Sequence, residues 1–397
     1  MKKKQLINEI MGVPKAVDDW VNYITAVSTL LVNEIIEEDK WETRDFEYKG
    51  ESYPMYSQGN GIQGRDVMKL ITQIRDEDLV TFLDSETFQN FPLYNPVIEV
   101  KVSAFPDEVY ESEGMGDRMG ATHTYDGNIV DIKLGKLGKR TIFSKNKFIF
   151  DVDMPFSMIE NPDDQRLFDM FMPTIGHELT HAYQTYRQLL GGKTSVGFGR
   201  ETILNMLPQQ MKYSQTPSWN YFLHLVYLHL SFEANARVTE LYYKLKRSGA
   251  KTQKEIMSLV TKSDPWKDYK MLKEFNTEEF LNKFDAQLEN DDPFRELMMM
   301  FLPKDKKLPK LPSSNEEWIE QLIDRWDNMI QDAQEHLNDM GIDIPVMSKV
   351  PKKAKENPVL FFKFFEERFH KKAEKLRRKL IKMISLVLQE AEQKKAS

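Results

Sequence analysis

The residues best suited to chemistry form one short motif, His177-Glu178-Leu179-Thr180-His181. Residues four apart lie about one turn apart on an α-helix, with a rise of about 6 Å, so both imidazoles project from the same face. Two ring nitrogens placed in this way can bind a single Zn²⁺ ion at about 2.0–2.1 Å. Glu178 then lies beside the ion, within reach of a water whose pKa zinc lowers toward about 7. The motif predicts a metal site with His177 and His181 as ligands and Glu178 as general base.

The residues around the motif are typical of a helix that packs on a core. The opposite face of this helix carries Ile175, Leu179, Ala182 and Tyr186. The pair Gly191-Gly192 is a C-terminal stop, while Pro173 predicts either a kink or the first turn of a new helix. The alternative interpretation is a surface helix that carries two incidental histidines.

A small sheet is predicted before this helix, because the hydrophobic period changes to two after Val97. Ile98, Val100, Val102 and Ala104 share one side of a strand, and a second strand at 148–153 is a candidate edge strand. Asp126-Gly127 is a hairpin turn signal between THTY and NIVDIKL. We therefore expect a small, mainly antiparallel sheet, in which His123 is a further candidate to line a cleft.

The HELTH motif on a helix behind a small sheet resembles the zincin metallopeptidases, over about residues 97–248. The resemblance implies zinc-dependent hydrolysis of peptide bonds, with extended substrate lying antiparallel to an edge strand. Metzincins continue the motif as HExxHxxGxxH, but this chain has Gln184 and Arg187 in place of that glycine and histidine. The similarity is therefore to the gluzincins, in which a glutamate from a later helix is the third ligand.

Under this resemblance the third zinc ligand is Glu233, in the middle of a helix predicted over 217–247. The same helix face also holds His229, Arg237 and Glu240. Such a row of polar groups is costly to bury unless it is paired, and a metal centre would explain it. The alternatives are an exposed ion pair between Glu233 and Arg237, or His229 or Glu240 as the ligand. Gluzincins often carry an acidic residue four positions after the ligand, which orients one histidine, and Arg237 stands there in this chain.

His229 and Arg237 are also the candidates for a catalytic role besides Glu178. Either side chain can polarise the substrate carbonyl or stabilise the oxyanion that forms from it.

The regions on both sides of this core are predicted to be helical. We expect a helical N-terminal region over 1–96, a zincin-like catalytic core over 97–248, a helical region over 249–350 and a basic amphipathic C-terminal helix over 351–397. A Pro/Lys-rich linker is expected at 301–314. The first helix follows from a stripe of Val17, Trp20, Ile24, Val27, Leu31 and Ile35. The predicted fold class is therefore α+β and predominantly helical, with a small sheet, an active-site helix and a second ligand helix at its centre.

The C-terminal helix, over about 359–388, is strongly basic. Residues 351–397 carry 14 Lys/Arg and 6 Asp/Glu, whereas the whole chain has a net charge of −7. Its apolar stripe is Phe369, Ala373, Leu376, Leu380, Met383 and Val387. The favoured interpretation is a helix packed on the acidic remainder of the chain with its lysines in water; binding to nucleic acid, an acidic membrane surface or a partner helix is the alternative.

Composition excludes several classes of function. The chain has no cysteine, so disulfide frameworks, thiol nucleophiles and Cys-ligated zinc are ruled out. The chain contains no run of eighteen apolar residues, so we expect no membrane span. The basic start lacks the apolar segment of a signal peptide. We expect a cytoplasmic protein that acts on a peptide or protein substrate, or a virion-associated one if the chain is phage-encoded. The rival function is a non-catalytic structural or assembly protein that keeps a zincin-like fold.

Overall fold

The structure of the protein is a computed structural model. It describes residues 15–93, 96–112, 119–125, 129–133, 139–143, 146–190, 217–229, 231–284, 314–326 (without 318, 322 and 325) and 350–396. The chain folds into two compact units. The first unit contains the sheet and the helices around it, α11 from Asn235 onward, α12 and the end of α18 from Leu380. The second contains α10, α13, α14, α17 and the first part of α18.

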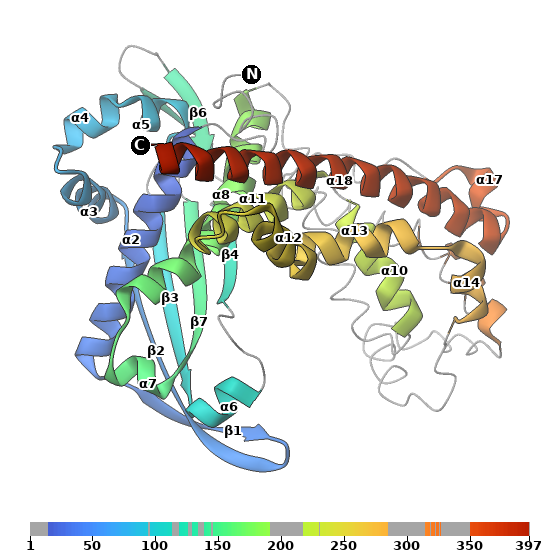
Figure 1. Cartoon of the computed structure of the whole chain (residues 1–397), viewed down its shortest axis with the longest axis horizontal. Helices are drawn as coiled ribbons and strands as arrows, with labels where there is room; N and C mark the ends of the chain where they lie inside the picture. Colours follow the sequence, from blue (N-terminus) through green and yellow to red (C-terminus); the bar gives the residue numbers. More distant parts are fainter. Residues whose placement is uncertain are drawn as a thin grey trace, which may run out of the picture. The chain divides into compact units, whose positions relative to one another are not determined.

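The sheet of the first unit has five strands in the order β1-β2-β3-β7-β4 (Figure 1). These strands are β1 (Glu42–Tyr48), β2 (Glu51–Gln63), β3 (Pro96–Phe105), β7 (Asn146–Pro155) and β4 (Met119–Tyr125). Only the central pair, β3 and β7, runs parallel, with Val100 opposite Phe150. A separate hairpin joins β5 (Ile129–Lys133) to β6 (Lys139–Phe143). The α+β class and the mainly antiparallel sheet are confirmed.

Two strand predictions need correction. The strand at 148–153 is real, but β7 lies inside the sheet between β3 and β4, so it is not an edge strand. The edge strands of this sheet are β1 and β4. In the described part of the chain β4 pairs with β7 and β5 pairs with β6, so the strands that flank Asp126-Gly127 have other partners than each other. Residues 126–128 themselves lie outside the described residues.

Helices cover one face of the sheet, and α2 (Lys15–Glu38) is one of them. It contacts β2 and β3 and packs along α8 (Asp164–Leu190), which in turn contacts β4. The predicted stripe of α2 is buried at every position, and so are the sheet residues Ile98, Val100, Phe148 and Phe150. The alternating strand residues, such as Lys101 and Asp151, are exposed on the other face. The apolar core of this unit therefore lies between the sheet and these helices.

The N-terminal region is only partly helical, which corrects the prediction for 1–96. After α2, this region forms the helices α3 (Arg65–Arg75), α4 (Leu79–Asp84) and α5 (Glu86–Asn90). Residues 42–63, however, form β1 and β2 of the sheet. Lys49 and Gly50 connect these strands with positive φ angles of 50° and 84°. Most of β1 is exposed, so its sequence lacks the buried alternation that identifies a strand.

The helix that carries the HELTH motif is continuous. α8 runs through Pro173 without ending, and the structure describes it as far as Leu190. The predicted stop at Gly191-Gly192 lies outside the described residues. Short helices α6 (Asp107–Ser112) and α7 (Phe156–Glu160) flank the sheet. The single helix predicted over 217–247 is wrong, because the chain forms two helices, α10 (Pro217–Leu228) and α11 (Ser231–Arg247). His229 and Glu233 therefore do not belong to one uninterrupted helix.

The second unit is built around aromatic side chains. Phe222 of α10 is fully buried and contacts the rings of Phe275, Phe280, Phe361, Phe362, Phe365 and Phe369. The last four belong to α18 (Pro358–Ala396), Phe275 directly follows α13 (Asp264–Glu274), and Phe280 belongs to α14 (Thr277–Asn282). Residues 301–313 of the predicted linker lie outside the described residues.

The basic helix α18 buries the whole apolar stripe predicted for it, from Phe369 to Val387. Lys371, Lys375 and Lys382 of the basic face are exposed, but Lys372 is buried, which corrects its placement on the solvent side. The remaining described helices are α12 (Gln253–Lys262) and α17 (Lys352–Lys355). None of the described helices is both long and apolar enough to cross a membrane.

Candidate metal centre

The two histidines of the HELTH motif face each other across one turn of α8. The Nε2 atoms of His177 and His181 are 3.0 Å apart. Both side chains are half-buried, whereas Leu179 and Thr180 between them are buried. The spacing of four residues thus places the two imidazoles on one face of α8, with their Nε2 atoms within hydrogen-bond distance of each other.

A carboxylate from a distant part of the chain lies against the other nitrogen of the first histidine. Oε2 of Glu240, on α11, is 3.4 Å from Nδ1 of His177, and its Oε1 is 2.7 Å from Nζ of Lys244. Glu240 therefore lies on the Nδ1 side of the ring, away from the point where the two Nε2 atoms converge. In this position it orients the histidine, as an outer carboxylate does in carboxylate–histidine–zinc arrangements, and does not take a ligand position.

The environment of Glu240 keeps its carboxylate ionised. Burial alone would raise its pKa, but the hydrogen bond from His177 and the Lys244 ammonium lower the pKa from 4.5 to about 2. An ionised carboxylate accepts a hydrogen bond from Nδ1–H, so the neutral His177 ring carries its lone pair on Nε2. This is the tautomer that a metal ligand needs at Nε2.

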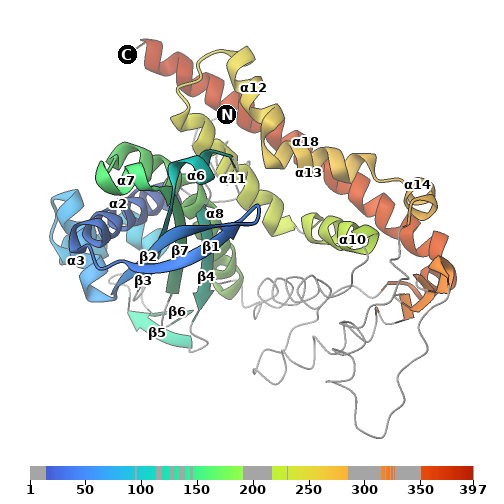
Figure 2. The same ribbon diagram turned by 90° about the horizontal axis from the view of Figure 1, so that it is seen from below.

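Helices α8 and α11 run antiparallel where they carry these residues. From His177 toward the N-terminus of α8, three residues contact α11 in turn. His177 contacts Glu240, Gly176 contacts Tyr243, and Asp169 pairs with Arg247 at 3.4 Å. Figures 1 and 2 both show α11 beside α8 in the first unit. Because residue numbers rise along α11 as they fall along α8, the turn of α11 before Glu240, which carries Ala236 and Arg237, lies on the side of His181.

The histidine pair fits a metal ion. Two nitrogens at 2.0–2.1 Å from a tetrahedral ion are about 3.3 Å apart, which is within a few tenths of an ångström of the Nε2 separation. Within the part of the chain that the structure describes, no three His, Cys, Asp or Glu side chains are arranged to hold a metal together. Among the described residues, the candidate site thus consists of two histidines and one carboxylate that contacts the first of them.

For the other predicted site residues, the structure gives the position on a helix but fewer side-chain contacts. Glu178 is half-buried on α8, one residue after His177. Glu233 lies in the first turn of α11, but its side chain is outside the described residues. Arg237 is half-buried on α11, three residues before Glu240. His229 directly follows α10, where its N–H donates to the carbonyl of Leu225.

Sequence reasoning missed the orienting role of Glu240. It considered this residue only as an alternative ligand and looked for the orienting carboxylate at position 237. The signal was present, because Glu240 lies seven residues, or two turns, after Glu233 and so occupies the same helix face.

The edge of the sheet near α8 is formed by β4. This strand contacts α8, and its His123 is opposite Phe148 of β7. The side chain of His123 lies outside the described residues, so its expected place in a cleft stays a prediction.

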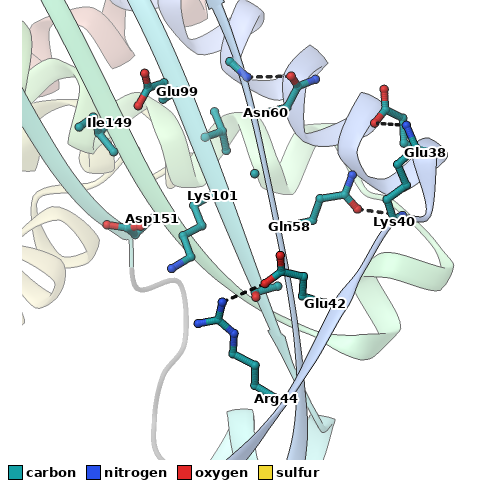
Figure 3. A pocket seen from close by; sticks show the side chains of 14 residues that line it. Glu38, Lys40, Glu42, Arg44, Gln58, Asn60, Glu99, Lys101, Ile149 and Asp151 are labelled. Carbon is teal, nitrogen blue, oxygen red and sulfur yellow. Dashed lines mark hydrogen bonds and ion pairs between the residues drawn. The ribbon is translucent and has the colours of Figure 1, made fainter.

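A hollow lies on the open face of the sheet, and neither of these histidines lines it. It has a volume of about 800 Å³, and Figure 3 shows Glu42, Arg44, Lys101 and Asp151 around it. Gly59 and Gly61 of β2 also line it. Arg44 pairs with Glu42 at 2.9 Å, and Glu99 also lines the hollow, so its walls mix both signs of charge. None of the predicted site residues lines this hollow.

Comparisons with known proteins add no assignment. No family model matches the sequence, and neither the curated proteins nor the solved structures include a significant match.

Proposed function

We propose that this protein is a zinc-dependent hydrolase of peptide bonds with a zincin-like core. The observation that carries the proposal is the convergence of His177 Nε2 and His181 Nε2 at 3.0 Å, with Glu240 at Nδ1 of His177. Two incidental surface histidines would have no need of a partly buried carboxylate that fixes one ring. The absence of cysteine fits a site made of imidazole and carboxylate groups.

Glu233 is the third ligand in this proposal. The helical repeat of α11 supports it, because Glu233 lies seven residues, or two turns, before Glu240 on this helix. A zinc ion held by His177, His181 and Glu233 would lower the pKa of a water and polarise the scissile carbonyl.

The protein residues then divide the remaining work. The Glu178 carboxylate accepts a proton from the attacking water and passes it to the nitrogen of the leaving amine, so that one water is added across the broken C–N bond. Arg237 and His229 are the candidates to stabilise the negative charge that develops on the carbonyl oxygen. A peptide or protein is the substrate.

The proposal is tested with Glu178→Gln, and Glu160→Gln on α7 is the matched control because Glu160 is exposed and lies outside the motif. Zinc content and cleavage of casein and a peptide library are measured for both variants and the wild type. We expect about one zinc per chain in all three proteins, and a loss of about 10²–10⁴-fold in cleavage for Glu178→Gln only. A wild type that binds no zinc refutes the metal centre.

A non-catalytic scaffold predicts another result from the same experiment. The wild type would bind zinc and cleave no peptide, and Glu178→Gln would be indistinguishable from it. Glu233→Gln separately tests the third ligand: it should lower zinc affinity at least as much as Glu240→Gln, because a ligand contributes more than an outer partner.

A further inference from the structure

One glycine beside the histidine pair allows helices α8 and α11 to approach closely. A Cβ atom added to Gly176 would lie 2.5 Å from Cδ2 and from Cε2 of Tyr243. Ordinary contacts between carbon atoms are about 3.5–4.0 Å, so an alanine requires about 1 Å more space between these groups. Gly176 directly precedes His177, and Tyr243 lies one turn after Glu240 on α11.

The ring of Tyr243 cannot easily yield that space. Tyr243 is 2% exposed, and its hydroxyl donates a short hydrogen bond to Oδ1 of Asp18 on α2. Burial and the nearby Asp18 raise the pKa of the Tyr243 hydroxyl well above its usual value, so the phenol remains a hydrogen-bond donor. The neighbouring Tyr242 points elsewhere, because its hydroxyl donates to Glu390 of α18 at 3.1 Å.

The contact between His177 and Glu240 has little tolerance for a change in spacing. Its 3.4 Å separation is already at the long end of a hydrogen bond. An increase of about 1 Å between α8 and α11 at this level would end it. On the same turn of α8, the Thr180 hydroxyl donates to the Gly176 carbonyl at 2.7 Å.

We infer that Gly176 and Tyr243 are positioning residues for this site: their close contact sets the distance between α8 and α11 at which Glu240 reaches Nδ1 of His177. The ring of Tyr243, which is hydrogen-bonded to Asp18, acts as the spacer between the two helices. It packs directly on the backbone of α8 because Gly176 has no side chain there. The inference rests on the proposed metal centre only for its consequence for zinc, because the spacing itself acts on the metal-free protein.

The first test therefore uses no zinc. Ring-nitrogen NMR of the metal-free full chain at pH 8.5 reports the tautomer of His177, whose signals are identified with His177→Asn. We expect the Nδ1–H tautomer in the wild type, its loss in Gly176→Ala and in Glu240→Gln, and its retention in Tyr242→Phe. An unchanged tautomer in a folded Gly176→Ala protein overturns the inference.

The second test is a double-mutant cycle in zinc affinity. Gly176→Ala and Glu240→Gln should each weaken zinc binding by about 10–100-fold, and the double variant should lose no more than either single variant. Fully additive losses would mean that Gly176→Ala acts by general disruption, which contradicts the inference. If the wild type binds no zinc, the proposed function fails, while the tautomer measurement still decides the inference.

A third test applies if Gly176→Ala does not fold, and it uses a second substitution that removes the steric conflict. Tyr243→Leu removes the ring atoms that the new methyl group would meet. We expect the combined variant Gly176→Ala with Tyr243→Leu to fold and to show the same His177 tautomer as Tyr243→Leu alone. If the combined variant does not differ from Gly176→Ala, the conflict does not lie with the Tyr243 ring and the inference is wrong.

Discussion

Replacing Glu240 with glutamine should remove a pH-dependent part of the protein's stability. The pKa of Glu240 is about 2 in the folded protein, compared with 4.5 for an unperturbed group. A carboxyl whose pKa is lowered by folding stabilises the protein above the unfolded value, and this stabilisation is lost as the pH falls from 4.5 to 2. Glutamine matches the shape of the side chain but does not titrate.

The pKa difference sets the magnitude of the effect. At about 1.4 kcal/mol per pKa unit, Glu240 contributes about 3 kcal/mol to the free energy of unfolding at pH 7. The same linkage gives about 2 kcal/mol at pH 3.5 and less than about 0.5 kcal/mol at pH 2. These are upper values, because the side chain is 25% exposed and water screens part of the interaction.

Urea unfolding of the metal-free protein at pH 7, 5 and 3.5 measures this difference. The transitions should be followed by fluorescence and by circular dichroism, because coincident curves are needed before a single free energy is assigned. Glu160→Gln is the control for losing an exposed carboxylate. We expect Glu240→Gln to approach the wild type as the pH falls. A destabilisation that stays constant from pH 7 to pH 3.5 would refute the electrostatic argument.

Three further predictions concern parts of the structure with different degrees of burial. Phe222→Ala should lower the unfolding free energy by about 3–5 kcal/mol in chemical denaturation, because the ring is fully buried among aromatic side chains; a change below about 1 kcal/mol would contradict that packing. Thr252→Ala should cost about 1 kcal/mol, because it removes the capping box with Glu255, and Thr252→Ser should retain most of it. Lys244→Met should change the free energy of unfolding by less than about 0.5 kcal/mol, because Lys244 is 54% exposed in its pair with Glu240. A loss like that of Glu240→Gln would show that Lys244 and not His177 is the main partner of the carboxylate.

Helices with a continuous apolar stripe were predictable because their burial repeats along the sequence itself. The stripe from Val17 to Ile35 is buried as expected in α2, and that from Phe369 to Val387 is buried in α18. The central strands β3 and β7 were predictable for the same reason, since alternate residues enter the core.

Elements without such a pattern were missed. β1 is mostly exposed and is held by backbone pairing with β2, which leaves little trace in its side chains. The break between α10 and α11 was also missed, because the apolar residues on its two sides continue without a proline or glycine. The position of β7 inside the sheet depends on its pairing with β4, a strand from a different part of the chain.

The same distinction between local pattern and tertiary contact applies to the candidate site. The sequence alone determined that His177 and His181 share one face of a helix, because a spacing of four residues is set by the local geometry of the backbone. Only the tertiary structure decided that Glu240 is the carboxylate at His177, since that contact depends on how closely α11 approaches α8. That distance is set by the packing of the Tyr243 ring on Gly176, and no local periodicity records a contact between residues 67 positions apart.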